Sequence, residues 1–172
     1  MTALDQIRAL HDYNEWATGH VLDAASALSE EELSRELGAS FGSVRGNLSH
    51  IAHAQAIWLS RWTGERFAAP PQPESGRAIE ALRESFRVSH EGLHRFLGTL
   101  DEDRLSRQFS YVDTQGNAQQ RVLWQAMLHL ANHGTHHRAE TAMLLTALGH
   151  PPRQLDYIFF ELERAGGAPR LT

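Results

Sequence analysis

The chain of 172 residues contains no cysteine and no lysine. Without cysteine it can form no disulfide, thiolate metal site, iron–sulfur cluster or cysteine nucleophile of its own. Without lysine it can form neither a Schiff base nor the phosphate-binding loop that a lysine completes. All 16 basic residues are therefore arginines, and the 21 aspartates and glutamates outnumber them.

Long apolar runs and an excess of positive charge are also missing. No run of about 18 or more apolar residues occurs, so we expect no membrane-spanning helix. The first residues lack the basic and then apolar pattern of a secretory signal. The net charge of −5 with neutral histidines argues against binding to nucleic acid or an anionic membrane. We therefore expect a single domain over residues 1–172, in the cytoplasm, with neither nucleic acid nor membrane as a partner.

The apolar residues recur mainly at helical spacing. This periodicity predicts long helices over residues 3–28, 43–63, 76–100 and 118–148. It also predicts two short helices, one that begins near residue 30 and one over residues 154–164. Gly64 and Gly149 mark two helix ends. Residues 109–117 alternate and then turn, which predicts a short extended pair, and the Pro-rich residues 68–76 predict a loop. Four long amphipathic helices predict an all-α protein, an antiparallel four-helix bundle.

Histidine is unusually frequent in this chain, with 11 residues. Its imidazole is the common nitrogen ligand of transition metals and the common proton shuttle near neutral pH. The histidines are His11, His20, His50, His53, His90, His94, His129, His133, His136, His137 and His150. Helical bundles build metal sites from inward-facing side chains of neighbouring helices, so the question is which of these rings face inward.

His133 and His137 are the candidates in the fourth long helix. Their spacing of four residues places them on one helix face. At about 100° per residue, His137 lies within about 50° of the apolar direction and His133 within about 90°, whereas His129 and His136 lie more than about 100° away. Gly134 leaves room beside the two rings. Such a pair needs a third ligand from elsewhere in the chain.

The second long helix offers His50 and His53 as that third ligand. His50 lies about 70° from the centre of the apolar arc and His53 more than about 100°, so His50 is the better candidate. In the third long helix His90 and His94 form a rival pair at about 45° and 85°, which periodicity does not exclude. Glu91 with His94 resembles half of a di-iron motif, but the chain lacks the other half.

Three segments of the chain carry a further signal. They are Tyr13-Asn14-Glu15-Trp16-Ala17, the stretch from Phe41-Gly42-Ser43 through Leu48-Ser49-His50-Ile51 to Thr63-Gly64, and Asn132-His133-Gly134-Thr135-His136-His137-Arg138 followed by Leu148-Gly149-His150-Pro151-Pro152. Together they resemble the DinB/YfiT-like family of metal-dependent enzymes. The likeness spans nearly the whole chain, and the last run is its most specific part. Relatives often have Gly-Gln after the arginine, where this chain has Ala139-Glu140.

The resemblance implies an up-down-down-up four-helix bundle, often a homodimer, with a divalent metal on three histidines. Zinc and nickel are the metals most often implied, and the ligands by position are His50, His133 and His137. Only the resemblance excludes His90 and His94 of the third long helix as the metal ligands. Three neutral imidazoles leave a coordination position open, as in catalytic rather than structural sites. That position can take water or an external thiol, and some relatives use the thiol of a small cofactor.

We therefore predict a metal-dependent enzyme that acts on a small molecule, a thiol S-transferase or isomerase with a low-molecular-weight thiol as co-substrate. The alternatives are a metal-dependent hydrolase that uses water, and a non-enzymatic bundle that binds metal or a ligand. Asn47, Asn132 and Glu140 are the candidates to accept the second ring N–H of a metal-binding histidine. Arg138 is expected to pair with a carboxylate at the surface, or else to bind an anionic substrate. Residues 13–16 either wall the pocket or belong to the core.

Overall fold

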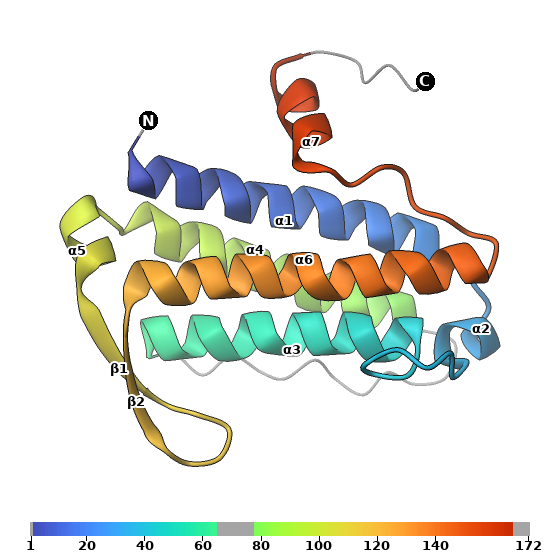
Figure 1. The fold of residues 1–172 in the computed structure, drawn as a ribbon, viewed down its shortest axis with the longest axis horizontal. Helices are drawn as coiled ribbons and strands as arrows, with labels where there is room; N and C mark the ends of the chain where they lie inside the picture. The colour runs from blue at the N-terminus through green and yellow to red at the C-terminus, as the bar shows by residue number, and fades with distance from the viewer. Residues whose placement is uncertain (1, 65–77, 167–172) are drawn as a thin grey trace.

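The computed structural model describes residues 2–64 and 78–166. Its body consists of four long helices (Figure 1): α1 (Ala3–Ala25), α3 (Val44–Thr63), α4 (Ala78–Gly98) and α6 (Leu123–Ala147). The shorter elements are α2 (Glu30–Ser34), α5 (Glu102–Ser106), α7 (Tyr157–Arg164) and the strands β1 (Gln108–Val112) and β2 (Ala118–Val122). The predicted all-α class is confirmed. Among the described helices, none has the length and apolar character needed to cross a bilayer.

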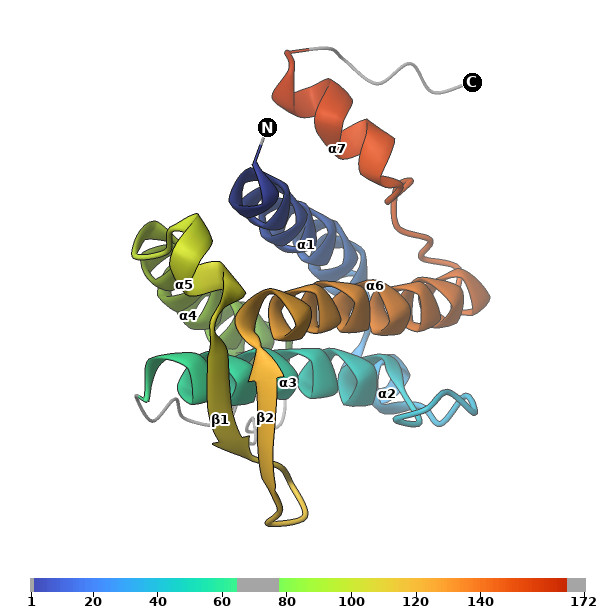
Figure 2. The same ribbon diagram turned by 60° about the vertical axis from the view of Figure 1, so that its left-hand side comes forward.

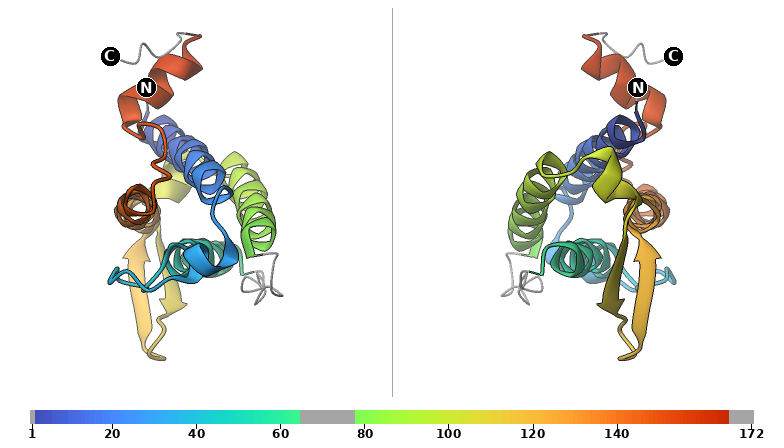
Figure 3. Two further views of the ribbon diagram at one scale, coloured as in Figure 1. Left: turned by 90° about the vertical axis from the view of Figure 1, so that its right-hand side faces the viewer. Right: turned by 90° about the vertical axis from the view of Figure 1, so that its left-hand side faces the viewer.

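The four long helices surround a common core in the order α1, α6, α3, α4, as the end-on views in Figure 3 show. One apolar cluster joins the C-terminal halves of α1 and α6 to the N-terminal halves of α3 and α4. The helices α1 and α6 therefore run in one direction, and α3 and α4 run in the other (Figure 1). This is the up-down-down-up arrangement that the family resemblance implies.

A β-hairpin occupies the start of the predicted fourth helix. Residues 118–122 pair antiparallel with residues 108–112, in a register that places Gln108 opposite Val122 and Val112 opposite Ala118. The hairpin confirms the predicted extended pair and shows that a helix start at residue 118 is wrong, because cross-strand hydrogen bonds engage the backbone of β2. Figure 2 shows the hairpin leaving the start of α6 and passing α3.

Other helix ends differ from the prediction by a few residues. The first helix ends at Ala25 rather than at residue 28, and the last begins at Tyr157 rather than at 154. Ser43 caps α3 by accepting the backbone N–H of Gly46 at 3.1 Å, and Gly64 ends it with a φ of 74°. The predicted loop at residues 68–76 and the predicted helix start at residue 76 lie outside the described residues.

The interior of the bundle consists of two apolar clusters with a polar layer between them. One cluster includes Leu48 and Phe86, and the other includes Leu59 and Met127. The polar layer contains the buried side chains of His11, Asn14, Thr18, Gln55, Ser89, His90, Arg138 and Thr141. Most of these groups are hydrogen-bonded: Ser89 Oγ donates to Gln55 Oε1 at 2.9 Å, for example, and Thr141 Oγ1 donates to the carbonyl of His137 at 2.7 Å.

We expect the free energy of unfolding to fall as the pH is lowered from 7 toward 4. Burial, and then the charges of His90 and His94, lower the pKa of His11 from 6.5 to about 4. An unfolded chain protonates this ring near pH 6.5, so between these values the unfolded state binds more protons. The stabilisation is complete above that range and is lost as the pH falls through it, at up to about 1.4 kcal/mol per pH unit.

Urea unfolding of chelator-treated protein at several pH values measures this slope. The variant His11→Gln should have a slope that is smaller by up to about 1.4 kcal/mol per pH unit between pH 5 and 6. His53→Gln is the matched control, because His53 is exposed on α3. Equal slopes in His11→Gln and the unmodified protein would contradict the assignment to this buried ring.

Candidate metal centre

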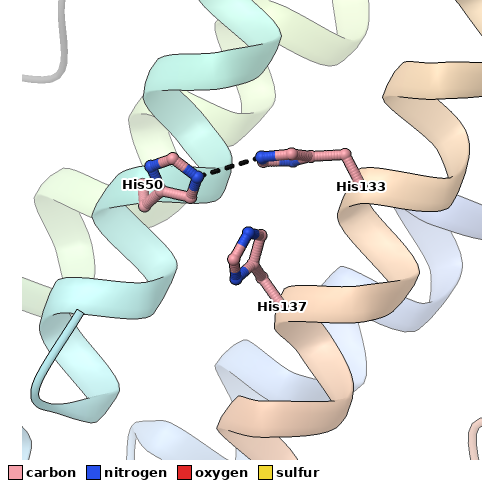
Figure 4. A group of neighbouring side chains, drawn as sticks. All are labelled: His50, His133 and His137. Atoms are coloured by element: carbon pink, nitrogen blue, oxygen red, sulfur yellow. Dashed lines mark hydrogen bonds between the residues drawn. The ribbon is translucent and has the colours of Figure 1, made fainter. Parts of the chain in front are cut away.

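Three histidines from two helices converge at the groove between α3 and α6 (Figure 4). One ring nitrogen from each of His50, His133 and His137 lies within 4.8 Å of those of the other two. The Nε2 atoms of His50 and His133 are 2.9 Å apart, and the ring centroid of His137 is 4.6 Å from both other centroids. The structure thus brings together the same three rings that the resemblance selected.

The surroundings of His50 and His133 keep these two rings neutral at neutral pH. Burial is the main cause that lowers the pKa of both His50 and His133 to about 4, and the neighbouring charge of His137 adds to it. His137 is itself buried, with 8% of its surface exposed. Because the neutral imidazole is the form that binds a metal, His50 and His133 need no deprotonation at neutral pH to act as ligands.

Glu140 holds the ring of His137 in one orientation. The Nδ1–H of His137 donates to Glu140 Oε2 at 2.9 Å, and Ser40 Oγ donates to Glu140 Oε1 at 2.5 Å. The hydrogen bond from Ser40 is the largest cause that lowers the pKa of this carboxyl group. With Nδ1 engaged, Nε2 is the atom of His137 that remains as a ligand, which is the usual arrangement behind a metal-binding histidine.

The two asparagines that the sequence offered for this role form no hydrogen bond with the three rings. Asn47 is fully buried, but its Oδ1 accepts the backbone N–H of Phe41 at 3.2 Å. Asn132 is exposed and forms no hydrogen bond with the three histidines. Asn47 therefore acts on the site indirectly, through the position of Phe41.

Phe41 covers one side of the histidine cluster. Its ring stacks on that of His50 with centroids 3.6 Å apart, and its centroid lies 5.4 Å from that of His137. A Cβ atom at Gly46 would lie 1.9 Å from the carbonyl oxygen of Phe41, so this close approach requires glycine. The family likeness includes Phe41, but nothing in the sequence alone assigned it this place.

The other face of α6 packs against α1 through Arg138, which is buried rather than paired at the surface. Arg138 is 1% exposed. Its Nη1 donates to Asn14 Oδ1, its Nη2 donates to Thr135 Oγ1 at 3.1 Å, and its guanidinium lies 5.4 Å from the ring centroid of Tyr13. These partners satisfy the guanidinium without a carboxylate, and burial lowers its pKa to about 10. The expectation of a surface ion pair is therefore wrong.

Gly134 makes room for this contact and not for the histidine rings. A Cβ atom there would lie 2.6 Å from Asn14 Oδ1 and 2.7 Å from Arg138 Nη1. The prediction that the missing side chain leaves space beside His133 and His137 is therefore wrong. The space lies on the α1 side of the helix.

The aromatic residues of α1 form its contact with α7. The Tyr13 hydroxyl donates to the carbonyl of Leu155 at 2.8 Å, and Trp16 Nε1 donates to Glu163 Oε2 at 2.7 Å. Both rings pack against Phe160. Their contacts support the core interpretation rather than a wall of the histidine site.

The rival pair on α4 has other neighbours. Gln55 Nε2 donates to His90 Nε2 at 3.3 Å, and His94 Nε2 donates to Glu15 Oε2 at 2.6 Å. Neither ring belongs to a group of three potential ligands in the part of the chain that the structure describes.

A second group of potential ligands lies on α6 alone and consists of His136, His137 and Glu140. Both carboxylate oxygens of Glu140 are already hydrogen-bonded, one to His137 and one to Ser40, and His136 is exposed. The cluster that contains His50 is the stronger candidate, because it joins two helices.

The fold and the three histidines define a helical-bundle protein with a candidate metal centre. Among known proteins, the DinB family matches residues 2–168 of the chain. The chain is also 21% identical over 155 residues to Protein DinB of Bacillus subtilis (strain 168), an alignment that covers 86% of this chain and 89% of that protein. The chain belongs to the DinB family.

We expect Gly134→Ala to lower the free energy of unfolding by about 1–3 kcal/mol, because its Cβ must displace the Asn14–Arg138 contact. Gly19→Ala is the matched control, since a Cβ at Gly19 in α1 meets nothing within 4 Å. There the change should be neutral or stabilising by up to about 1 kcal/mol. Urea unfolding measures both variants, and equal stabilities would contradict the packing role of Gly134.

Proposed function

We propose that this protein is a metal-dependent enzyme in which His50, His133 and His137 hold one divalent ion, zinc or nickel. The observation that carries the proposal is the convergence of three rings from α3 and α6, with Glu140 hydrogen-bonded behind one of them. Imidazole nitrogens bind zinc at about 2.0–2.1 Å. Tetrahedral ligands at that distance lie roughly 3.3 Å apart, so the 2.9 Å between His50 and His133 needs only a small ring adjustment.

The set of three ligands supports a catalytic rather than a structural role for the metal ion. Three protein ligands leave a coordination position for an external molecule. A bound divalent ion supplies Lewis-acid chemistry there, since it lowers the pKa of a small thiol or of water. The chain contains no cysteine, so a thiol nucleophile comes from outside. We propose a low-molecular-weight thiol as co-substrate and a small electrophilic molecule as substrate, in an S-transfer or an isomerisation.

The chain's own residues have distinct parts in this proposal. Glu140 fixes the tautomer of His137, so that its Nε2 lone pair is available. Phe41 shields the ring of His50 by stacking on it, while 42% of the Phe41 surface stays exposed. We further propose a homodimer in the cytoplasm, which rests on the resemblance and on the sequence.

Metal content tests the centre directly. We expect protein purified without a histidine tag to carry about one zinc or nickel ion per chain, because three histidine rings converge there. The variants His50→Ala and His137→Ala should lose the ion. His53→Ala and His136→Ala are matched controls from the same two helices, and both side chains are exposed. Elemental analysis and zinc titration of the chelator-treated protein are the measurements.

The same preparations separate the function classes. Turnover of electrophiles that requires both the ion and an added thiol supports the proposed transferase or isomerase, and turnover without thiol would identify a hydrolase. A native protein that holds no metal and takes up neither zinc nor nickel would contradict the proposal of a metal-dependent enzyme. Loss of the ion in His53→Ala rather than in His50→Ala would show that the ligand assignment is wrong.

Glu140→Gln should weaken zinc affinity by about 10–100-fold, because such a hydrogen-bond partner orients a ligand ring and raises its basicity. Glutamine keeps the size of the side chain, so the fold is retained. Competition with a chromophoric chelator measures the affinity. Glu80→Gln on α4 is the control, since Glu80 is exposed. Equal affinities for both variants would remove Glu140 from the centre.

A further inference from the structure

A cavity of about 550 Å³ lies between α3, the hairpin and α6. Trp58 and Arg61 of α3, Tyr111 and Arg121 of the hairpin, and His129 of α6 are among the residues that line it. Its volume is in the usual range for small-molecule sites. Figure 2 shows the hairpin passing α3 beside the start of α6, and side chains of all three elements line the cavity.

One residue of the cavity wall, His129, lies next to the candidate metal centre. The ring centroid of His129 lies 5.9 Å from that of His133 and 5.4 Å from that of Trp58. Trp58 follows His50 by eight residues on α3, which is roughly 12 Å along a helix. The cavity therefore lies about two helical turns along α3 from the histidine cluster, with His129 between them.

The walls of the cavity combine aromatic faces with positive charge. The ring centroids of Trp58 and Tyr111 are 5.2 Å apart, and the Arg61 guanidinium lies 4.8 Å from the first and 4.7 Å from the second. Arg61 Nη2 donates to the carbonyl of Val112 at 3.0 Å, which fixes the side chain. Aromatic faces and a fixed guanidinium together suit a flat molecule that carries a carboxylate.

The positive charge of the cavity is not cancelled within the described part of the chain. Arg61 and Arg121 take part in none of the ion pairs among the described residues; Arg121 Nη1 donates to the carbonyl of Gln120. Asp113 also lines the cavity and contributes one negative charge there, and its carboxylate accepts the backbone N–H groups of Gln115 and Asn117 at 2.9 Å each. The two guanidinium groups outnumber this carboxylate, so the lining keeps a net positive charge for an anionic ligand.

A second cavity, of about 600 Å³ between α1 and α7, lacks this property. Its arginines are paired, Arg8 with Asp5 and Arg164 with Glu161. Helix α7 lies beside α1 (Figure 1), whereas the histidine cluster lies between α3 and α6 (Figure 4). The comparison singles out the cavity beside the histidines.

We propose that this cavity binds the substrate of the enzyme, and that the substrate is a small organic acid with an aromatic or conjugated body. Its carboxylate pairs with Arg61 and Arg121, its flat body packs on Trp58 and Tyr111, and its reactive end lies toward the three histidines. The identification of this acid as the substrate rests on the proposed function. The prediction that the cavity binds an aromatic acid is independent of the proposed function.

Binding of 3-phenylpropionate to chelator-treated protein tests the site, with 3-phenylpropanamide as the neutral probe of the same shape. In nuclear magnetic resonance titrations, the indole N–H signal of Trp58, assigned with Trp58→Phe, should shift saturably with the acid. The amide should bind about tenfold more weakly, since it lacks a charge-assisted contact. Arg61→Gln and Arg121→Gln should each weaken the binding of the acid by a similar factor. Arg95→Gln should leave the binding of the acid unchanged, because Arg95 is an exposed residue of α4.

The outcomes distinguish this proposal from the proposed function. Acid binding that needs Arg61 and Arg121 but persists in His50→Ala establishes the site even if native protein holds no metal. No saturable shift at millimolar acid, or equal binding of acid and amide, would overturn it even if the metal centre stands. Because Arg61 also contacts the hairpin, Arg121→Gln supplies the second variant: if it binds the acid normally, the proposed carboxylate pairing with Arg121 is wrong.

Discussion

The arrangement of the site depends on one helix that serves two neighbours at once. In α6, Gly134 and Arg138 face α1, while His133 and His137 face α3. Consecutive residues of a helix point about 100° apart. The pair His133 and His137 and the pair Gly134 and Arg138 each have a spacing of four and are shifted by one residue, so they face two different neighbouring helices. The buried guanidinium of Arg138 has Asn14 of α1 as a partner, and this contact sets the rotation of α6 that aims the histidines at α3.

Periodicity predicted the long helices and the inward histidines within each of them, because both are local properties of a helix. It could not choose between the pairs on α4 and α6, since both lie at similar angles to their apolar stripes. The choice depends on neighbours distant in sequence: His90 meets Gln55 of α3, whereas His133 meets His50. The family resemblance supplied what the local pattern lacked.

The two main errors have the same physical origin. Arg138 seemed a surface residue because a charged side chain is rarely buried, yet Asn14, Thr135 and the ring of Tyr13 satisfy it inside the bundle. Residues 118–122 continue a helical pattern, yet pairing with residues 108–112 holds them as a strand. In both cases, partners that no local pattern shows determine the outcome.

The position of the histidines at a groove, rather than in the centre of the bundle, follows from their angles to the apolar stripes. The rings of His50 and His133, about 70–90° from the stripe, reach the boundary between two helices, whereas His137, within about 50°, is buried. The polar layer of the interior is separate, and its side chains mostly bond to one another. The boundary position leaves the rings of His50 and His133 partly accessible, with Phe41 on one side and the hairpin beyond His129 on the other. The short hairpin therefore matters more than its size indicates, because it supplies Tyr111 and Arg121 opposite Trp58 and so forms one wall of the cavity.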